Sequence, residues 1–404
     1  MKYHTLLLLS FTFLFIFLSC NNSGKIKSIT EESLRHDLDK YHSQLNAFRL
    51  EFGGTYDLPD ISFFLFGMGN RDKYLYKQGK LIDCLTGKTK YSWDFKSDMI
   101  VPSSYAVSGL TNEGHKIIIF EDKKGIWLSD QGGLVKINQW DCPIRIPEFE
   151  DHRYGEILKV LHQEILINIV NSKPLPNYFV YDKPWRRDAA MMAMCLELTG
   201  NKDLIEEWVL NIKDPYDRNN GVMQGSPEEE VDNLGQTLYL LSLFTDKKHP
   251  AVTNILNEIS KWQVEDHNAK YIRGRSDFQE VPVYQTKWLI YGLEKLGIDN
   301  NYSIPLIPDN YSSLFWWDFK EYHVEGNEWT NEKYPYIGWA RDHFYHKKNG
   351  LISNSDYPLT WETEASQADY DGMKIISQEY VKRRIASPHT WHAAEIFLYL
   401  YDMK

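Results

Sequence analysis

The residue types best suited to chemistry on a polar substrate follow an aromatic loop near the middle of the chain. Arg187 and Asp188 come soon after Trp185, and Tyr178 and Tyr181 precede all three. Aromatic faces pack against the C–H side of a sugar, while arginine and aspartate hydrogen-bond its hydroxyls in a fixed geometry. The same residues also fit a helix start without a ligand, since the helix dipole favours an aspartate in the first turn and the tryptophan can belong to the core.

Two further acidic segments lie where helices are expected to begin. One contains Asp277 and Glu280 and precedes Pro282, and the other contains Glu362 and Glu364. Hydrolysis of a glycosidic bond uses one carboxylic acid that protonates the leaving oxygen and one carboxylate that activates water or attacks directly. Two acidic segments far apart in the sequence could supply such a pair. Each could equally be a helix-start carboxylate, since Pro282 and the acids before it are ordinary helix N-terminal signals.

The order of these motifs resembles the six-hairpin, (α/α)6-barrel glycosidases, and most closely the glucoamylase and glucodextranase branch. The segment from Tyr178 to Ala189 is similar to the motif of that family's first helix, in which an Arg–Asp pair holds the sugar hydroxyls. Residues 232–239 resemble the Asp-led helix that lines the same cavity. Residues 277–280 are similar to the segment with the general acid, and residues 364–367, followed by 388–394, resemble the base loop and last helix.

The resemblance implies an inverting glycoside hydrolase that needs no cofactor and no metal. Glu280 would be the general acid, and Glu364 would be the base, with Glu362 as the next choice. The sugar site implied by the same motifs consists of Trp185, Arg187, Asp188, Asp232, Gln236, Asp277, Gln367 and Trp391.

Two other classes of function remain open. A surface glycan-binding protein without catalysis is favoured by Phe278 and Gln279, which stand where the family's acid motif carries Trp and a second Glu. A lyase or epimerase on the same barrel would need a base such as Tyr178, His389 or His392 and a uronic or amino sugar. The two histidines have a spacing that could bind a metal, but the sequence offers no third ligand at a convincing spacing.

The sequence patterns of the helices and strands that must position these residues predict a mainly-α fold with two parts. Residues 30–50 form an amphipathic helix, and short alternating runs between glycine turns predict a small β-rich domain up to residue 150. Residues 151–404 are expected to form a toroid-like (α/α)6 ring of helical hairpins. The helices expected there span residues 153–171, 185–199, 202–212, 229–245, 249–263, 282–297, 309–320, 336–346, 364–383 and 388–402.

The first residues resemble a bacterial lipoprotein signal. An apolar run, Leu6 to Leu18, is shorter than the ~20 residues of a membrane-spanning helix. Cys20 then follows in a lipobox-like context, although an ordinary secretory signal with a chance cysteine is the alternative. We predict a signal peptide at residues 1–19, lipidation of Cys20 and a tether at residues 20–29. The protein would then be exported and held at the cell envelope by lipid.

Composition narrows the classes of partner. The formal net charge is −11 and aromatic residues make up 14% of the chain. An acidic chain argues against nucleic acid, since phosphate binding needs a basic face. Carbohydrate and other glycan-processing envelope proteins are the expected partners. In an oxidising compartment Cys84 and Cys142 could form a disulfide, while Cys195 lies on an apolar helix and is expected to be a buried small hydrophobic residue.

Overall fold

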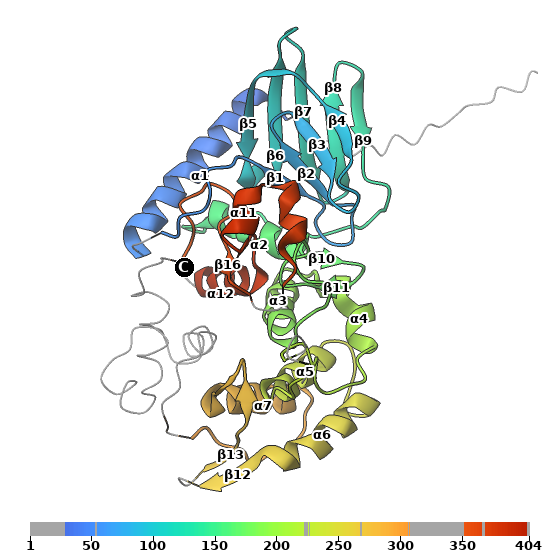
Figure 1. Cartoon of the computed structure of the whole chain (residues 1–404), viewed down its shortest axis with the longest axis vertical. Coiled ribbons are helices and arrows are strands. Elements are labelled where there is room, and N and C mark those ends of the chain that lie inside the picture. The colour runs from blue at the N-terminus through green and yellow to red at the C-terminus, as the bar shows by residue number, and fades with distance from the viewer. Residues whose placement is uncertain are drawn as a thin grey trace, which may run out of the picture.

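The computed structural model describes residues 29–52, 55–221, 225, 227–266, 269–305, 307, 351–365 and 368–401. Two antiparallel sheets form one end of the molecule, α1 (Glu31–Phe52) runs alongside them, and the other helices extend away from the sheets (Figure 1). One continuous cluster of buried apolar side chains includes residues of α1, both sheets and the helices. The sheets and the helices therefore share one core.

Both sheets are meanders, with the strands in the order β1-β2-β3-β4 and β5-β6-β7-β8-β9. Tight turns such as that of Gly79, at φ 72°, join neighbouring strands. The strands are β1 (Phe64–Phe66), β2 (Tyr74–Lys77), β3 (Lys80–Asp83), β4 (Thr89–Ser92), β5 (Phe95–Val101), β6 (Ala106–Thr111), β7 (Lys116–Asp122), β8 (Gly125–Asp130) and β9 (Gly133–Lys136).

The helices beyond the sheets pack in a row rather than in the order of the chain. The last helix lies against both α2 and α3, α3 packs on α5, and α5 packs on α7. Most of their side chains are buried all round, as expected for helices inside a core. They are α2 (Gly155–Ile167), α3 (Arg186–Leu198), α4 (Glu206–Leu210), α5 (Asp232–Ser242), α6 (Pro250–Trp262), α7 (Pro282–Lys295), α11 (Gln378–Lys382) and α12 (Thr390–Tyr401).

Four two-stranded pairs and three 3-10 turns complete the described part of the fold. The paired strands are β10 (Ile169–Val170) with β11 (Lys173–Pro174), β12 (Gln263–Asp266) with β13 (Ala269–Ile272), β14 (Arg275–Ser276) with β15 (Gln279–Glu280), and β16 (Glu362–Thr363) with β17 (Ile385–Ala386). The 3-10 turns are η1 (Pro102–Ser104), η2 (Lys202–Ile205) and η4 (Tyr370–Ile375).

The prediction of a mainly-α (α/α)6 barrel is wrong. The described residues are 38% helix and 21% strand, and the N-terminal part contains the two sheets described above. Within the described residues after 150 there are eight α-helices, two of them only five residues long, where six hairpins need twelve. The strand content was underestimated because β3, β4 and β5 carry many exposed polar residues and have weak apolar patterns.

The expected helix at residues 364–383 is also absent. Among the described residues of that range the chain forms η4 and α11 instead. Glu364 has φ 57°, in the left-handed region, and Ser377 is extended where it caps α11. A continuous helix cannot pass through either conformation. The helices expected at residues 309–320 and 336–346 lie outside the described residues.

The cysteines do not follow the predicted pairing. Cys84, Cys142 and Cys195 are buried and none of them forms a disulfide, so the bond that Cys84 and Cys142 could have formed is absent among the described residues, while the expectation that Cys195 is buried is confirmed. The Tyr178 hydroxyl donates a hydrogen bond to Cys84 Sγ over 3.3 Å, and the Asn70 amide donates to Cys142 Sγ over 3.4 Å. Each thiol therefore has its own contact.

Residues 1–28, which include the predicted signal peptide and Cys20, lie outside the described part of the chain. In the part that is described, none of the helices combines the length and the apolar character needed to cross a lipid bilayer.

The close contact between α5 and α7 depends on glycine. A Cβ at Gly235 would lie 2.3 Å from the backbone carbon of Trp288, and a Cβ at Gly292 would lie 2.6 Å from Gly235 O. We expect Gly235→Ala to lower the free energy of unfolding by about 3 kcal/mol, because backbone cannot move aside as a flexible side chain can. Urea unfolding would measure this change.

Gly132→Ala is a suitable control for that measurement. Gly132 meets only the Asp130 side chain, at 3.2 Å. Its replacement should change the free energy of unfolding by no more than about 0.5 kcal/mol. Equal effects of the two alanines would contradict the importance of the α5–α7 contact.

Candidate active site

The beginning of α3 places an arginine and an aspartate side by side in a buried position. Trp185 precedes the helix in an extended conformation, and Arg187 and Asp188 occupy its first turn, each 6% exposed. The Arg186 backbone amide donates to Asp217 Oδ2 over 2.8 Å, which satisfies one of the free N–H groups of the helix start. The sequence therefore predicted correctly that these residues begin a helix.

Arg187 is held by carboxylates of neighbouring segments. Its Nε donates to Asp232 Oδ2 over 2.9 Å, and another guanidinium nitrogen donates to Glu230 Oε1 over 2.8 Å. Gln236, one turn further along α5, donates to the same Asp232 oxygen over 3.0 Å. The structure thus brings together three predicted residues, Arg187, Asp232 and Gln236, and adds Glu230.

Asp277 reaches the same cluster from the β14–β15 hairpin. Asp277 and Phe278 are the two loop residues of this hairpin and have φ 49° and 63°, as a type I′ turn requires. The Asp277 amide donates to Glu230 Oε1 over 2.5 Å, and Asp277 Oδ1 lies 4.0 Å from the Arg187 guanidinium. The Asp277 side chain is 45% exposed, so this contact lies at the surface side of the cluster.

Next to Arg187, a second group of polar side chains surrounds an imidazole. We call Tyr181, Asp188, Glu362 and His389 the carboxylate–histidine cluster. His389 Nε2 lies 3.1 Å from Glu362 Oε2 and 3.6 Å from Asp188 Oδ1, and the Tyr181 hydroxyl donates to Glu362 Oε2 over 2.6 Å. Elements far apart in the sequence, α3, β16 and the start of α12, supply these groups and lie together below the sheets in Figure 1.

The two carboxyl groups of this cluster favour opposite protonation states. Burial raises the pKa of Asp188 to about 7; His389 and Arg187 oppose this shift and the charge of Glu362 adds to it. Burial also acts to raise the pKa of Glu362, but the charge and hydrogen bond of His389 and the Tyr181 hydroxyl outweigh it, so that this pKa is lowered. Near neutral pH, Asp188 can therefore hold a proton while Glu362 is ionised.

His389 is shifted towards its charged form. Burial acts to lower the pKa of this histidine, but the charge and hydrogen bond of Glu362, together with Asp188, raise it above the usual value. Its other ring nitrogen, Nδ1, is buried without a hydrogen-bond partner among the described residues. The imidazole thus acts through Nε2, on the side of the two carboxyl groups.

Glu362 has access to solvent. Its side chain is 26% exposed, whereas those of Asp188 and His389 are 9% and 8% exposed. Among the described residues both of its polar contacts involve Oε2, so Oε1 is left for water or substrate. Beside it the ring of Trp361 stacks on Tyr56, with centroids 4.6 Å apart and planes inclined by 9°.

Glu280 and Glu364 are outside this cluster. Glu280, the predicted acid, is 51% exposed and binds Arg273 at 2.7 Å. Glu364 is exposed, because the left-handed backbone at this residue ends β16 and turns the chain. Of the two glutamates at 362 and 364, only Glu362 contacts His389.

The remaining predicted sugar-site residues have varied positions. Trp185 is partly buried and its ring meets that of Tyr181 edge-on, with centroids 6.0 Å apart. Trp391 is 7% exposed and belongs to the core. Gln367 lies outside the described residues.

Two members of the site were not identified as such from the sequence. Glu230 ends a run of three acids, Glu228 to Glu230, a pattern typical of solvated helix-start carboxylates, but it is 1% exposed and binds Arg187. His389 was considered only as a base for a lyase or epimerase, or as a metal ligand. The one sequence signal at His389 is its place directly before the final apolar helix, and no local pattern identifies Glu362 as its partner.

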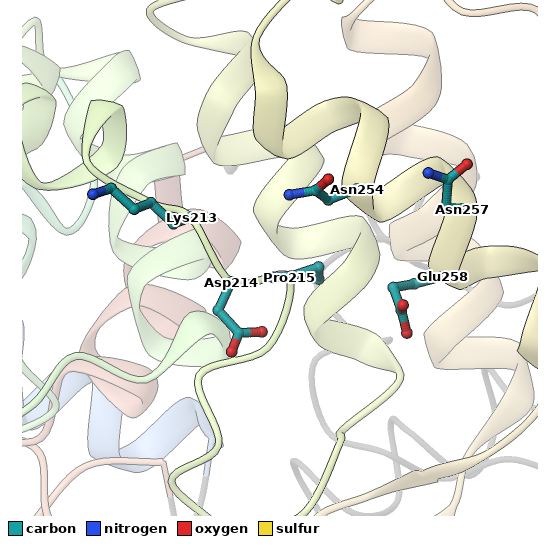
Figure 2. A pocket seen from close by; sticks show the side chains of 6 residues that line it. All are labelled: Lys213, Asp214, Pro215, Asn254, Asn257 and Glu258. Atoms are coloured by element: carbon teal, nitrogen blue, oxygen red, sulfur yellow. The ribbon is translucent and has the colours of Figure 1, made fainter.

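An open surface hollow lies elsewhere. Its volume is about 480 Å³, and its lining comes from the segment 213–215 and from one side of α6 (Figure 2). The lining residues are Lys213, Asp214, Pro215, Asn254, Asn257 and Glu258. None of them belongs to the two clusters described above. Among the described residues, no three His, Cys, Asp or Glu side chains are grouped so that they could hold a metal ion.

The arrangement around Asp188 and Glu362 is suited to acid–base chemistry, because it offers a proton donor and a proton acceptor side by side.

No family model, no curated protein and no solved structure matches the chain.

Proposed function

We propose that this protein hydrolyses a glycosidic bond, with Glu362 as the base and Asp188 as the proton donor. The proposal is carried by a pair of carboxyl groups beside one imidazole, where burial raises the pKa of Asp188 while His389 and Tyr181 lower that of Glu362. Glycoside hydrolysis requires such a division of roles between two carboxyl groups. The proposal rests on these contacts and does not depend on a barrel fold.

In the proposed reaction, Asp188 gives its proton to the glycosidic oxygen as the bond from that oxygen to the anomeric carbon breaks. Water adds to the anomeric carbon and passes a proton to Glu362 Oε1. His389 and Tyr181 hold Oε2 of the same carboxylate and keep it oriented. A fixed orientation of this kind is a large part of the rate gain of enzymes.

The surroundings fit a sugar. Trp185 and Tyr181 offer partly exposed aromatic surface, and Arg187 with Asp277 offers hydrogen-bonding groups at the surface side. Among the described residues, five carboxyl groups lie around two basic side chains: Arg187 contacts Glu230, Asp232 and Asp277, and His389 contacts Asp188 and Glu362. This excess of carboxyl groups over basic groups favours neutral or amino sugars over uronic acids, and so speaks against a lyase for uronic acids.

Asp188 replaces Glu280 as the proposed proton donor. Glu280 is exposed and binds Arg273, outside the carboxylate–histidine cluster. Asp188 is buried and has a pKa of about 7, in the range of an efficient general acid.

The experiment is a panel of neutral and amino-sugar oligosaccharides, with detection of new reducing ends and of the anomer that is released first. Turnover by the wild-type chain is expected, and the anomer that is released first distinguishes inversion from retention. Release of the retained anomer would exclude the inverting mechanism predicted from the sequence, and absence of turnover across the panel would contradict the proposed hydrolysis.

Glycan binding without catalysis is the second candidate. It is favoured by the position of Glu280, which leaves the predicted acid segment without a buried acid. The same panel separates the two functions, because a binding protein would retain the oligosaccharides in equilibrium dialysis without forming reducing ends.

Export and attachment to a membrane through lipid on Cys20 belong to the same proposal. The support is the lipobox-like sequence that ends in Cys20. In a bacterial host, the wild-type chain should partition into the detergent phase of a phase-separation assay, and Cys20→Ser should not. Equal partitioning of the two chains would contradict lipidation.

A further inference from the structure

A buried glutamate of α2 contacts the segment that carries Glu362. Glu164 is 0% exposed and accepts three hydrogen bonds: from the Leu359 amide over 2.5 Å, from the Thr360 amide over 3.1 Å and from the Thr360 hydroxyl over 2.5 Å. Burial of a carboxylate is costly unless several donors compensate for lost water. Because the three donors come from two consecutive residues, the Glu164 carboxyl group fixes the position of residues 359–360.

The Thr360 hydroxyl connects this segment to His389. Besides Glu164 Oε2, it lies 3.1 Å from the His389 backbone oxygen and 3.1 Å from the His389 backbone amide. A hydroxyl has one proton to donate and can accept further hydrogen bonds. Thr360 can therefore accept from the His389 amide while it donates to Glu164 or to the His389 carbonyl.

The two sides of the Glu362–His389 contact are thus tied together at Thr360. Glu362 follows Thr360 by two residues and is paired in β16 with Ala386 of β17. On the other side, the carbonyl of Pro388 accepts hydrogen bonds from the Asn168 and Asn177 side chains, which also fix the start of α12. Little freedom remains for the 3.1 Å contact between the two functional groups.

We infer that Glu164 and Thr360 are positioning residues, which set the distance and angle between Glu362 and His389 without touching the substrate. This inference rests on the proposed hydrolysis, in which an oriented Glu362 carboxylate accepts the proton of water. A displacement of about 1 Å at a reacting group can reduce a rate about 100-fold. Loss of the Thr360 hydroxyl should therefore affect catalysis more than binding.

The first test compares kinetic constants. Thr360→Val is expected to lower kcat about 10- to 100-fold with KM changed less than about 3-fold, and Thr360→Ser, which keeps the hydroxyl, should restore most of the rate. Glu164→Gln should also lower kcat, because the NH₂ group of the glutamine side chain would face the backbone N–H of Thr360, and two donors cannot form a hydrogen bond.

Thr199→Val is the matched control. Thr199 is buried near the other end of α3, and its hydroxyl also has three partners: Cys195 O at 2.9 Å, His162 Nε2 at 3.1 Å and Asn201 Nδ2 at 3.1 Å. The control should lose comparable stability in urea unfolding and keep the wild-type kcat. Equal losses of kcat in Thr360→Val and Thr199→Val would overturn the positioning role.

The second test does not depend on activity. In NMR titrations of ¹⁵N-labelled imidazoles, the signal that disappears in His389→Asn reports on His389. Thr360→Val should move the pKa of this signal towards the usual value of about 6.5 by at least ~0.5, and Thr199→Val should leave it unchanged. An unchanged pKa in Thr360→Val would overturn the inference even if no glycan is hydrolysed, whereas a changed pKa without turnover would contradict only the proposed hydrolysis.

Discussion

Glu362→Gln is expected to lower kcat about 10²- to 10⁴-fold, the usual contribution of a positioned general base. Glutamine preserves the size of the side chain, so the hydrogen bond from Tyr181 can persist. What is lost is the negative charge that accepts the proton of water. Steady-state kinetics on any oligosaccharide that the wild-type chain cleaves would measure the loss.

Glu364→Gln provides the control for this substitution. Glu364 is two residues away, carries the same charge and was the first choice for the base from the sequence, but it is exposed and does not contact His389. Its variant should retain the wild-type kcat within about 3-fold. The reverse result, a large loss in Glu364→Gln and none in Glu362→Gln, would contradict the assignment of the base to Glu362.

Asp188→Asn is expected to lower kcat about 10²- to 10⁴-fold, and to do so by removing the proton donor. In the wild-type chain, kcat/KM should fall above about pH 7, because burial raises the pKa of Asp188 to about 7 and only the protonated form can act. His389, Arg187 and Glu362 face the same carboxyl group, and their charges are part of the balance that sets this pKa. The residual kcat/KM of the variant should not fall above pH 7. Measurement of kcat/KM over a series of pH values would test this.

Glu280→Gln is the competing variant, since the sequence predicted that residue as the acid. We expect it to retain most of the wild-type rate, as its exposed carboxylate binds Arg273. If Glu280→Gln instead loses activity and Asp188→Asn keeps it, the assignment of the proton donor returns to Glu280.

The same raised pKa has a consequence for stability. A carboxyl group with a pKa of about 7 in the folded chain and an ordinary one of 3.8 in the unfolded chain binds a proton more tightly when folded. Its contribution to stability is therefore complete below pH 3.8 and is lost as the pH rises towards 7. The loss amounts to about 4 kcal/mol at most, because each tenfold difference in proton affinity corresponds to about 1.4 kcal/mol.

Asp188→Asn isolates this contribution from those of other groups. The free energy of unfolding of the variant, relative to that of the wild type, should be up to about 4 kcal/mol higher at about pH 8 than at about pH 4. Urea unfolding of both chains at the two pH values would measure this difference. A difference between variant and wild type that is the same at both pH values would show that Asp188 does not carry a raised pKa.

Local patterns in the sequence were sufficient for the buried helices. The expected helices at 185–199, 249–263 and 282–297 agree with α3, α6 and α7 to within a few residues, because apolar spacing and proline or glycine at the ends act over one or two turns. For the same reason Arg187 and Asp188 were correctly assigned to the beginning of a helix. Most strands of the larger sheet could also be recognised from alternation between glycine turns.

Contacts between distant segments could not be obtained in this way. The mainly-α assignment missed β3, β4 and β5, because their pairing depends on neighbours and their exposed polar side chains have no strong period. The run of acids that contains Glu230 is typical of solvated side chains. Its contact with Arg187 follows from the position of α3 in the folded chain. Glu362 and Glu364 are equivalent as sequence, but a left-handed backbone at Glu364 separates them in space.

The amino-acid order alone was thus enough to show which short stretches form helices and which acids stand at their entrances, because hydrogen bonding and burial along one helix or hairpin are local. Which acid meets which base required the folded chain. Residues 188, 362 and 389 become neighbours only when α3, β16 and α12 pack beside one another, and the same packing removes water and separates the pKa values of the two carboxyl groups.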